Sequence, residues 1–237
     1  MDKIIVLDFG SQYNQLIARR VRELGVYSEI LPFNVDIETL KKDDVKGIVL
    51  SGGPNSVYDE FSPHISKDLY ALGKPVLGIC YGMQITQYLF GGKVSPSDKR
   101  EYGKSELTII KDSLITEGLP KTSTVWMSHG DHVDVLSKDF TLYAKTPSCM
   151  AIAKHDELDI YNLQFHPEVT HSEFGGKIIQ NFVELICDAK PSWDLNDYIT
   201  KTVNNIREIV KDEQVILALS GGVDSSVAAY LLKEQGY

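Results

Sequence analysis

The stretch KPVLGICYGMQITQYLFGG, residues 74–92, carries an apolar run into a helical pattern through a cysteine that lies between two glycines. Residues 75–79 are predicted as a buried strand, and the residues after Cys80 as a helix that runs through Leu89 and ends at the Gly-Gly pair. Small residues near Cys80 would allow a sharp turn that leaves its side chain exposed at the start of the helix. A short buried strand that leads directly into a helix is typical of α/β proteins.

Further units of this kind lie on the N-terminal side. Residues 3–9 and 48–50 are strand candidates, and a helix with Ile17, Val21 and Leu24 on one face lies between them. Helical signals are scarce from about residue 103 to 165, where short strand candidates follow one another at 107–110, 124–127, 142–145, 150–153 and 160–165. We therefore expect an α/β fold with a mixed, mostly parallel open sheet, helices on both faces and a closing helix near 178–186.

A domain boundary is predicted after residue 188, because Pro191 ends the preceding helical pattern. Residues 1–188 form the first predicted domain. Residues 189–237 contain an amphipathic helix pattern, a strand candidate at 215–219, a Gly/Ser loop and an apolar helix. A single β-loop-α unit cannot bury its own faces. Residues 189–237 are therefore expected to be a linker helix and the N-terminal fragment of a second α/β domain.

Composition and charge disfavour several classes of protein. The chain has 237 residues and a net charge of −9, which argues against nucleic acid as a partner. The densest basic stretch, residues 19–22, is interpreted as a solvated helix face. The three cysteines are widely spaced and lack a CxxC pair, so neither a disulfide framework nor a metal site is predicted. No signal peptide or apolar run of bilayer length is visible, and we expect a cytoplasmic protein without a membrane partner.

Cys80 is the candidate nucleophile of the sequence. The unpaired amides and the dipole of a helix N-terminus favour the thiolate form of a cysteine whose free pKa is about 8.5. His166 follows a strand candidate and is the candidate base, with Glu168 two residues on to orient its ring. The backbone amides of Gly53 and Tyr81 are candidate donors to an oxyanion.

Each of these features also has a structural alternative. Cys80 could be a small buried hydrophobic residue, and residues 51–54 (SGGP) could form an ordinary Gly-Pro turn. Residues 128–131 (SHGD) form a polar segment after a strand candidate, where binding loops often lie, but they could equally form a surface turn.

Taken together, three motifs resemble those of the class I, or triad, glutamine amidotransferases. They are LSGGP at 50–54, GICYGMQ at 78–84 and FHPE at 165–168, and the resemblance covers essentially all of residues 1–188. It implies that Cys80 attacks the side-chain amide of glutamine, that His166 is general base and then acid, and that Glu168 orients His166.

The same resemblance implies how glutamine binds and what is released. Gln84 would contact the substrate, and Gly130 and Asp131 would hold its backbone. Attack on the amide would give a γ-glutamyl thioester and ammonia, and water would then release glutamate. No cofactor is implied for this reaction.

A second glycine loop, SGGVDSS, follows the strand candidate at 215–219 and opens a helix. Amides of such a loop at a helix N-terminus form an anion site, but the GxxxxGK[ST] pattern of a Walker A loop is absent. The loop resembles the pyrophosphate loop of the ATP pyrophosphatase family, and a flexible Gly/Ser turn is the alternative. The resemblance assigns ATP binding to Ser220, Gly221, Gly222, Val223, Asp224, Ser225 and Ser226.

A triad glutaminase followed by this loop is similar to ligases that use ATP and Mg²⁺ to adenylate xanthosine 5′-monophosphate. Ammonia from glutamine then displaces AMP to yield GMP, and the longer enzymes are expected to be homodimers. No acceptor-binding region is visible in this sequence, so we expect the chain alone not to make GMP. The alternatives are a triad amidotransferase with another acceptor, as in anthranilate or CTP formation, a hydrolase of γ-glutamyl peptides, or a non-catalytic relative that binds glutamine.

Overall fold

The computed structural model describes residues 1–234, apart from the side chains of 97–101, 197, 201 and 234. The chain divides into two units, Met1–Ser192 and the residues from Trp193 onward. The first unit ends four residues beyond the predicted boundary at 188. Ala189 is buried in its core, and the N–H groups of Lys190 and Ser192 donate to the Asp2 carboxylate (3.0 Å) and the Gly25 carbonyl (2.9 Å). These contacts hold the segment after the last helix of this unit against it.

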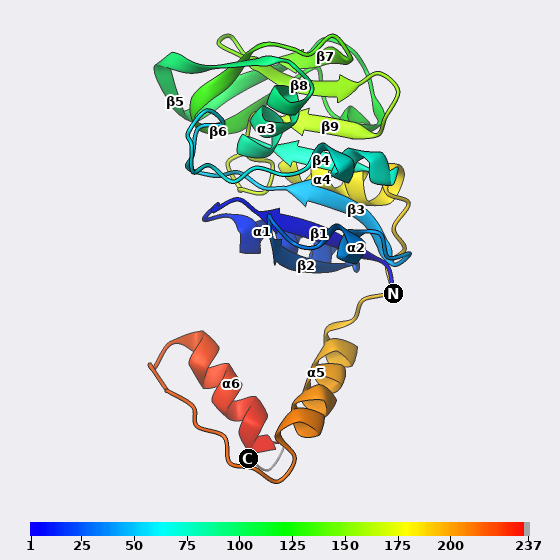
Figure 1. Ribbon diagram of the computed structural model, residues 1–237, viewed down its shortest axis with the longest axis vertical. Coiled ribbons are helices and arrows are strands. Elements are labelled where there is room, and N and C mark those ends of the chain that lie inside the picture. The colour runs from blue at the N-terminus through cyan, green and yellow to red at the C-terminus, as the bar shows by residue number, and fades with distance from the viewer. Residues whose placement is uncertain (235–237) are drawn as a thin grey trace. The chain divides into compact units, whose positions relative to one another are not determined.

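The strands of the first unit form one sheet in the order β2-β1-β3-β4-β9-β8-β7-β5-β6 (Figure 1). Four strand pairings from β2 to β9 are parallel, and the four from β9 to β6 are antiparallel. The mixed α/β sheet expected from the sequence is therefore confirmed. The strands are β1 (Lys3–Asp8), β2 (Tyr27–Pro32), β3 (Val45–Leu50), β4 (Val76–Ile79), β5 (Lys93–Ile109), β6 (Thr122–Val135), β7 (Phe140–Lys145), β8 (Met150–His155) and β9 (Ile160–Leu163).

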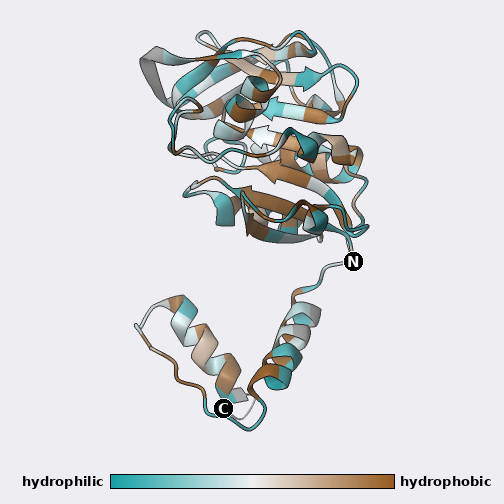
Figure 2. Ribbon diagram, viewed as in Figure 1, coloured by the Kyte–Doolittle hydropathy of each residue, from teal (hydrophilic) through white to brown (hydrophobic). Residues whose placement is uncertain are grey.

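The parallel strands are buried on both faces. Along β1, Ile4 and Val6 belong to one hydrophobic cluster while Ile5 and Leu7 belong to the other, as the two-residue period of a strand requires. Figure 2 shows β1 and β3 as predominantly hydrophobic ribbons. Continuous apolar strands of this kind need helices on both sides, which explains the patterns seen in the sequence.

Helices cover the two faces of the sheet. Ile17 of α1 and Ile178 of α4 lie in the cluster on one face, and Met83 of α3 lies in the cluster on the other. The helices are α1 (Asn14–Glu23), α2 (Ile37–Leu40), α3 (Tyr81–Leu89) and α4 (Gly175–Gln180), with 3₁₀ turns at Lys67–Leu72 and Leu114–Thr116 and a π-helical turn at Asn181–Ile186. The closing helix predicted near 178–186 is thus α-helical only at its start.

The basic stretch of α1 is not simply a solvated face, which corrects the interpretation from the sequence. Arg22 donates to the carbonyl of Ser28 at 2.6 and 3.2 Å, and Nε of Arg20 donates to the carbonyl of Glu168 at 3.2 Å. Only Arg19 is largely exposed, in a surface pair with Glu23. A helical pattern cannot reveal such bonds, because the carbonyl acceptors belong to segments outside the helix.

Two further expectations are corrected. Residues 128–131 lie within β6 and pair with β5, so this polar segment is part of a long hairpin and not a loop. Residues 215–219 form no strand, and Ile216 is 97% exposed. A strand needs a neighbouring strand for its backbone groups, and none pairs with 215–219 among the described residues. The second unit contributes the helices α5 (Leu195–Val210) and α6 (Val223–Glu234).

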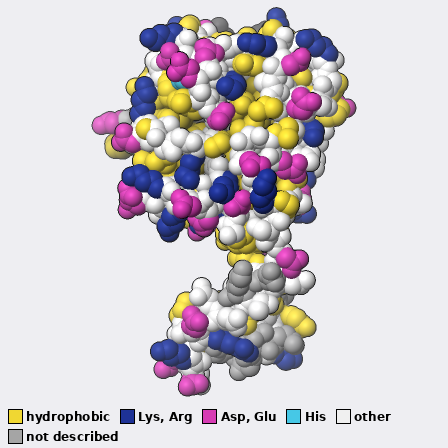
Figure 3. Space-filling model, turned by 90° about the vertical axis from the view of Figure 1, so that its right-hand side faces the viewer, with side chains coloured by type: hydrophobic (Ala, Val, Ile, Leu, Met, Phe, Trp, Pro, Cys, Tyr) yellow, Lys and Arg dark blue, Asp and Glu magenta, His cyan; other side chains and the backbone are white. Residues whose placement is uncertain are grey.

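The surface of the first unit carries both signs of charge. On the face drawn in Figure 3, Lys and Arg side chains are interspersed with Asp and Glu. The described side chains on this face form no continuous basic stripe of the kind that phosphate backbones require. Within residues 1–234, no helix is long and apolar enough to cross a membrane.

Two adjacent glycines of α4 test the packing of this helix. A Cβ at Gly175 would overlap the backbone of Pro167, whereas a Cβ at Gly176 has open space. We expect Gly175→Ala to lower the free energy of unfolding by about 1–3 kcal/mol through overpacking. Gly176→Ala is the matched control and is expected to raise it by up to about 1 kcal/mol through helix propensity. Urea unfolding measures both, and equal stabilities of the two variants would contradict this packing.

Candidate active site

Cys80 occupies the turn between β4 and α3. Its φ of 52° and ψ of −105° lie in a region that residues other than glycine adopt only at a cost. The N–H of Cys80 donates to the Leu163 carbonyl of β9 at 2.7 Å, and the N–H of Gly82 donates to the Ser51 carbonyl at 3.1 Å. A Cβ at Gly82 would overlap the Leu50 carbonyl. The sharp turn expected from the two glycines is confirmed, and the neighbouring strands hold it in place. The expected exposure of the side chain is wrong, because Cys80 is only 4% exposed and packs in the hydrophobic cluster on one face of the sheet.

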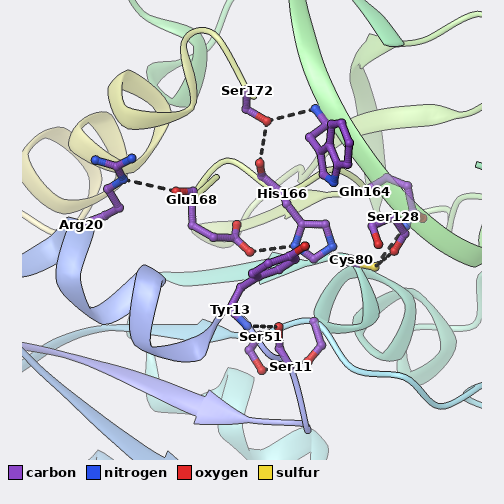
Figure 4. Close-up of polar contacts among 12 residues, drawn as sticks. Ser11, Tyr13, Arg20, Ser51, Cys80, Ser128, Gln164, His166, Glu168 and Ser172 are labelled. Atoms are coloured by element: carbon purple, nitrogen blue, oxygen red, sulfur yellow. Dashed lines mark hydrogen bonds and ion pairs between the residues drawn. The ribbon is translucent and has the colours of Figure 1, made fainter. Parts of the chain in front are cut away.

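His166 and Glu168 form a buried pair beyond the end of β9. Nδ1 of His166 lies 2.7 Å from Oε1 of Glu168, and the two side chains are 5% and 0% exposed. Figure 4 shows the imidazole of His166 between Glu168 and Cys80. The carboxylate therefore fixes the ring so that its other nitrogen is free to serve the cysteine.

The pKa of His166 reflects these neighbours. Burial by itself lowers this pKa, but the charge of Glu168 and the hydrogen bonds to Cys80 and Glu168 raise it well above its usual value. A raised pKa makes the imidazole a stronger base toward the proton of the Cys80 thiol. Once that proton has moved to His166, the sulfur is a thiolate, which is the reactive form of a cysteine.

The backbone of His166 is held by β6 and by a serine. Its N–H donates to the Trp126 carbonyl at 3.1 Å. The hydroxyl of Ser172 donates to the His166 carbonyl at 2.6 Å and accepts from the Trp126 N–H at 3.0 Å (Figure 4). The ring of Tyr13 contacts the imidazole edge-on, with centroids 5.1 Å apart. Sequence patterns did not identify Ser172, Tyr13 or Arg20 as part of this region, because no motif spacing connects them to His166.

The sulfur of Cys80 borders a cavity of about 680 Å³. The thiol donates to the Ser128 carbonyl at 3.7 Å. Gly52 lies close to the imidazole, since a Cβ at this position would be 3.1 Å from Cε1 of His166. The lining includes residues 10–13, 53–56, Cys80, Gln84, 128–131 and His166. A nucleophile and a base beside one cavity, with an orienting carboxylate behind the base, are suited to acyl transfer.

The other residues predicted for this site lie around the same cavity, with one exception. Gly53, Gly130 and Asp131 line it, whereas Tyr81 is fully buried as the first residue of α3. Its N–H nevertheless belongs to the first turn of the helix, where amides lack intrahelical partners. Gln84 also lines the cavity, but its side-chain amide donates to the Asp131 carbonyl at 2.8 Å. Gln84 therefore supports the Asp131 backbone, a role that the sequence does not reveal.

The second glycine loop opens α6, as the sequence predicts. Gly221 has a φ of 82°, and the hydroxyls of Ser225 and Ser226 donate to the Gly222 carbonyl at 3.1 and 2.8 Å. These are side-chain bonds back to a carbonyl within the first turn of the helix, in the second unit.

Comparison with known proteins identifies the family of the first unit. Residues 5–186 match the family described as glutamine amidotransferase class-I. The chain belongs to this family. Residues 213–237 match a second family, described as the tRNA methyl transferase HUP domain.

Curated relatives of this amidotransferase extend over almost the whole chain. It is 52% identical over 235 residues to the GMP synthase [glutamine-hydrolyzing] of Brachyspira hyodysenteriae, covering 99% of this chain and 46% of the relative. It is 50% identical over 232 residues to the enzyme of the same name from Fusobacterium nucleatum, with 98% and 45% covered. The chain thus spans about half the length of the curated relatives it matches.

Two solved structures agree with the fold. A protein from Thermoplasma acidophilum, described as one putative subunit of a GMP synthase, matches with a TM-score of 0.70 and 35% identity, over 85% of this chain and 98% of that one. A glutamine amidotransferase from Thermotoga maritima matches with a TM-score of 0.56 and 18% identity, over 99% of this chain and 96% of that one. The second likeness concerns the fold alone.

The charge of Glu168 is expected to control the reactivity of Cys80. Glu168→Gln removes the carboxylate that raises the pKa of His166, so burial should dominate and the ring should become a weaker base for the proton of Cys80. Alkylation of Cys80 by iodoacetamide at pH 7 should slow about tenfold for each unit by which the thiol pKa rises. Glu173→Gln, which removes an exposed carboxylate of the same segment, is the control. An unchanged alkylation rate in Glu168→Gln would show that the pair does not govern the thiol.

Proposed function

We propose that this chain hydrolyses glutamine to glutamate and ammonia, and that the ammonia serves the ATP-dependent amination of xanthosine 5′-monophosphate to GMP. The observation that carries the first part is that Cys80 and His166 line one cavity, with Glu168 hydrogen-bonded to His166, although Cys80 and His166 are 86 positions apart in the chain. Membership of the glutamine amidotransferase family supports the same reaction. The second part is supported by the relatives named GMP synthase, and it concerns a reaction of proteins about twice as long.

In the proposed reaction Cys80 gives its proton to His166 and attacks the side-chain carbonyl carbon of glutamine. The C–S bond forms while the carbonyl oxygen becomes an oxyanion, for which the amides of Gly53 and Tyr81 are the proposed donors. His166 then protonates the departing nitrogen, the C–N bond breaks and ammonia leaves. Water, deprotonated by His166, attacks the thioester, and glutamate is released from the regenerated Cys80.

Asp131 is the proposed partner of the glutamine α-ammonium group. The residue lines the cavity, and its Oδ2 is buried without a hydrogen-bond partner among the described residues. A buried carboxylate oxygen without a partner is costly unless a cation or donor reaches it. Gly130 beside it leaves the backbone accessible, and Gln84 holds the Asp131 carbonyl. The α-ammonium group of glutamine would supply the positively charged donor that Oδ2 of Asp131 lacks among the described residues.

Residues 220–226 are the proposed ATP site of the longer enzyme. The loop is exposed, Gly221 adopts a positive φ, and the N-terminal amides of α6 follow directly, which suits a phosphate group. Asp224 is of the residue type that Mg²⁺ prefers. The bound ATP would activate the acceptor oxygen. A homodimeric assembly and a cytoplasmic location belong to the same proposal, the latter because cysteines that form no disulfide among the described residues suit a reducing compartment.

The triad assignment is tested by the release of glutamate from glutamine. Cys80→Ser should reduce the rate at least about 10³-fold, since removal of a nucleophile disables the whole triad. Cys149→Ser changes a half-buried thiol that is not among the residues lining the cavity and should keep the rate of the unaltered chain. Equal rates in Cys80→Ser and the unaltered chain would refute the assignment.

The acceptor is tested in a chimera that continues this chain with the second half of the Brachyspira hyodysenteriae relative. ATP and xanthosine 5′-monophosphate together should stimulate glutamate release, and GMP and AMP should appear in equal amounts. A Cys80→Ser chimera should make GMP from an ammonium salt but not from glutamine. Stimulation by a different acceptor, without any by xanthosine 5′-monophosphate, would overturn the GMP part and leave the glutaminase part intact.

A further inference from the structure

We propose that the side-chain amide of Gln164 is a further catalytic group, which donates a hydrogen bond to the sulfur of Cys80 and stabilises its thiolate. The inference rests on the proposed function in one respect, namely that Cys80 is the nucleophile. The other two groups that contact the sulfur are the imidazole of His166 and the carbonyl of Ser128, and Gln164 adds a neutral donor to them.

Gln164 is placed against the sulfur by the strand that precedes it. It follows β9 directly, is fully buried, and its N–H donates to the Ala151 carbonyl of β8 at 3.0 Å. Its Nε2 lies 3.9 Å from Sγ of Cys80, and Figure 4 shows both residues beside Ser128. The residue therefore reaches the sulfur from the sheet, whereas His166 reaches it from the segment beyond.

The side-chain oxygen of Gln164 has no hydrogen-bond partner among the described residues. Buried glutamine amides are normally satisfied at both ends, and one that is not requires an explanation. Gln87, equally buried, provides the contrast: it donates to Asn162 at 2.9 Å and accepts from the Ser137 N–H at 2.9 Å. Gln87 thus has the bonding expected of a structural glutamine, whereas the side-chain amide of Gln164 is directed at the reacting atom.

The two protonation states of Cys80 call for different neighbours. As a thiol, the sulfur donates its proton to the Ser128 carbonyl, 3.7 Å away. Once the proton has moved to His166, that carbonyl oxygen faces a negative sulfur and opposes it. The N–H group of Gln164 is a donor, so it stabilises a sulfur with negative charge. Such charge-assisted bonds are about twice as strong as neutral ones. Gln164 therefore offsets Ser128 when the nucleophile forms and again when the thioester sulfur leaves.

Other titratable groups near the sulfur must be considered in any pH measurement. The cavity is lined by Asp59, Asp131, His129 and His166, together with Tyr13 and Tyr102, and Glu168 lies behind His166. Burial and the nearby His132 lower the pKa of His129 to about 4, so it is neutral in the range of interest. The group closest in role to Gln164 is His166, and it is unchanged in all the variants below.

The test replaces Gln164 by two apolar residues, Gln164→Met and Gln164→Leu, with Gln87→Met as the matched control. The measurement is the rate of iodoacetamide alkylation at Cys80 as a function of pH, followed by mass spectrometry of the peptide. Both Gln164 variants should raise the apparent thiol pKa by about one unit, and so slow alkylation about tenfold below that pKa. For glutamate release, kcat should fall while KM for glutamine changes little.

Stability separates this role from a structural one. Removal of a half-satisfied buried amide should leave the urea midpoint of Gln164→Met unchanged or higher, whereas Gln87→Met should lower it without moving the thiol pKa. An unchanged pH profile of alkylation in Gln164→Met or Gln164→Leu would overturn the inference. If Cys80→Ser is inactive in that case, the proposed function still stands. If Cys80→Ser is active, the proposed function fails whatever Gln164 does.

Discussion

The turn at Cys80 is packed against β3 and β9 without room for additional atoms. Gly82 lies against the backbone of Leu50, and the N–H of Cys80 is bonded to the Leu163 carbonyl. The first contact sets the start of α3 over the sheet, and the second connects the nucleophile to the strand that ends three residues before His166. A strained backbone at Cys80 is tolerated because both neighbouring strands determine it. This turn therefore sets where the nucleophile lies relative to His166.

Burial then gives the site its chemistry. Glu168 is fully buried, so its charge acts on His166 with little screening by solvent, and this outweighs the burial that would otherwise discharge the ring. The main chain around the pair is held from three directions, by Trp126, Ser172 and Arg20. A buried carboxylate and an imidazolium are costly to bring together, and the fixed backbone keeps them at the distance where the attraction offsets that cost.

Much of the fold follows from local patterns. The apolar runs of β1, β3 and β4, each flanked by glycine or helical periodicity, are sufficient to predict a sheet covered on both faces. The hairpin of β5 and β6 does not follow from such patterns. Residues 128–131 lack the alternation of apolar and polar side chains that marks a strand, so they look like a turn until their partners in β5 are known. The segment 215–219 shows the converse, since its apolar, β-branched pattern predicts a strand that cannot form without a neighbour.

The sequence by itself determined the type of turn at Cys80, the candidate triad and the α/β class, because glycine spacing and strand–helix alternation are properties of neighbouring residues. Tertiary structure alone decided that Gln84 holds Asp131, that Arg20 and Ser172 fix the backbone around His166, and that Gln164 faces the sulfur. These contacts join residues between 6 and 148 positions apart in the chain. Their physical basis is the burial of polar groups, which must find partners wherever the fold brings them, and no local pattern records that choice.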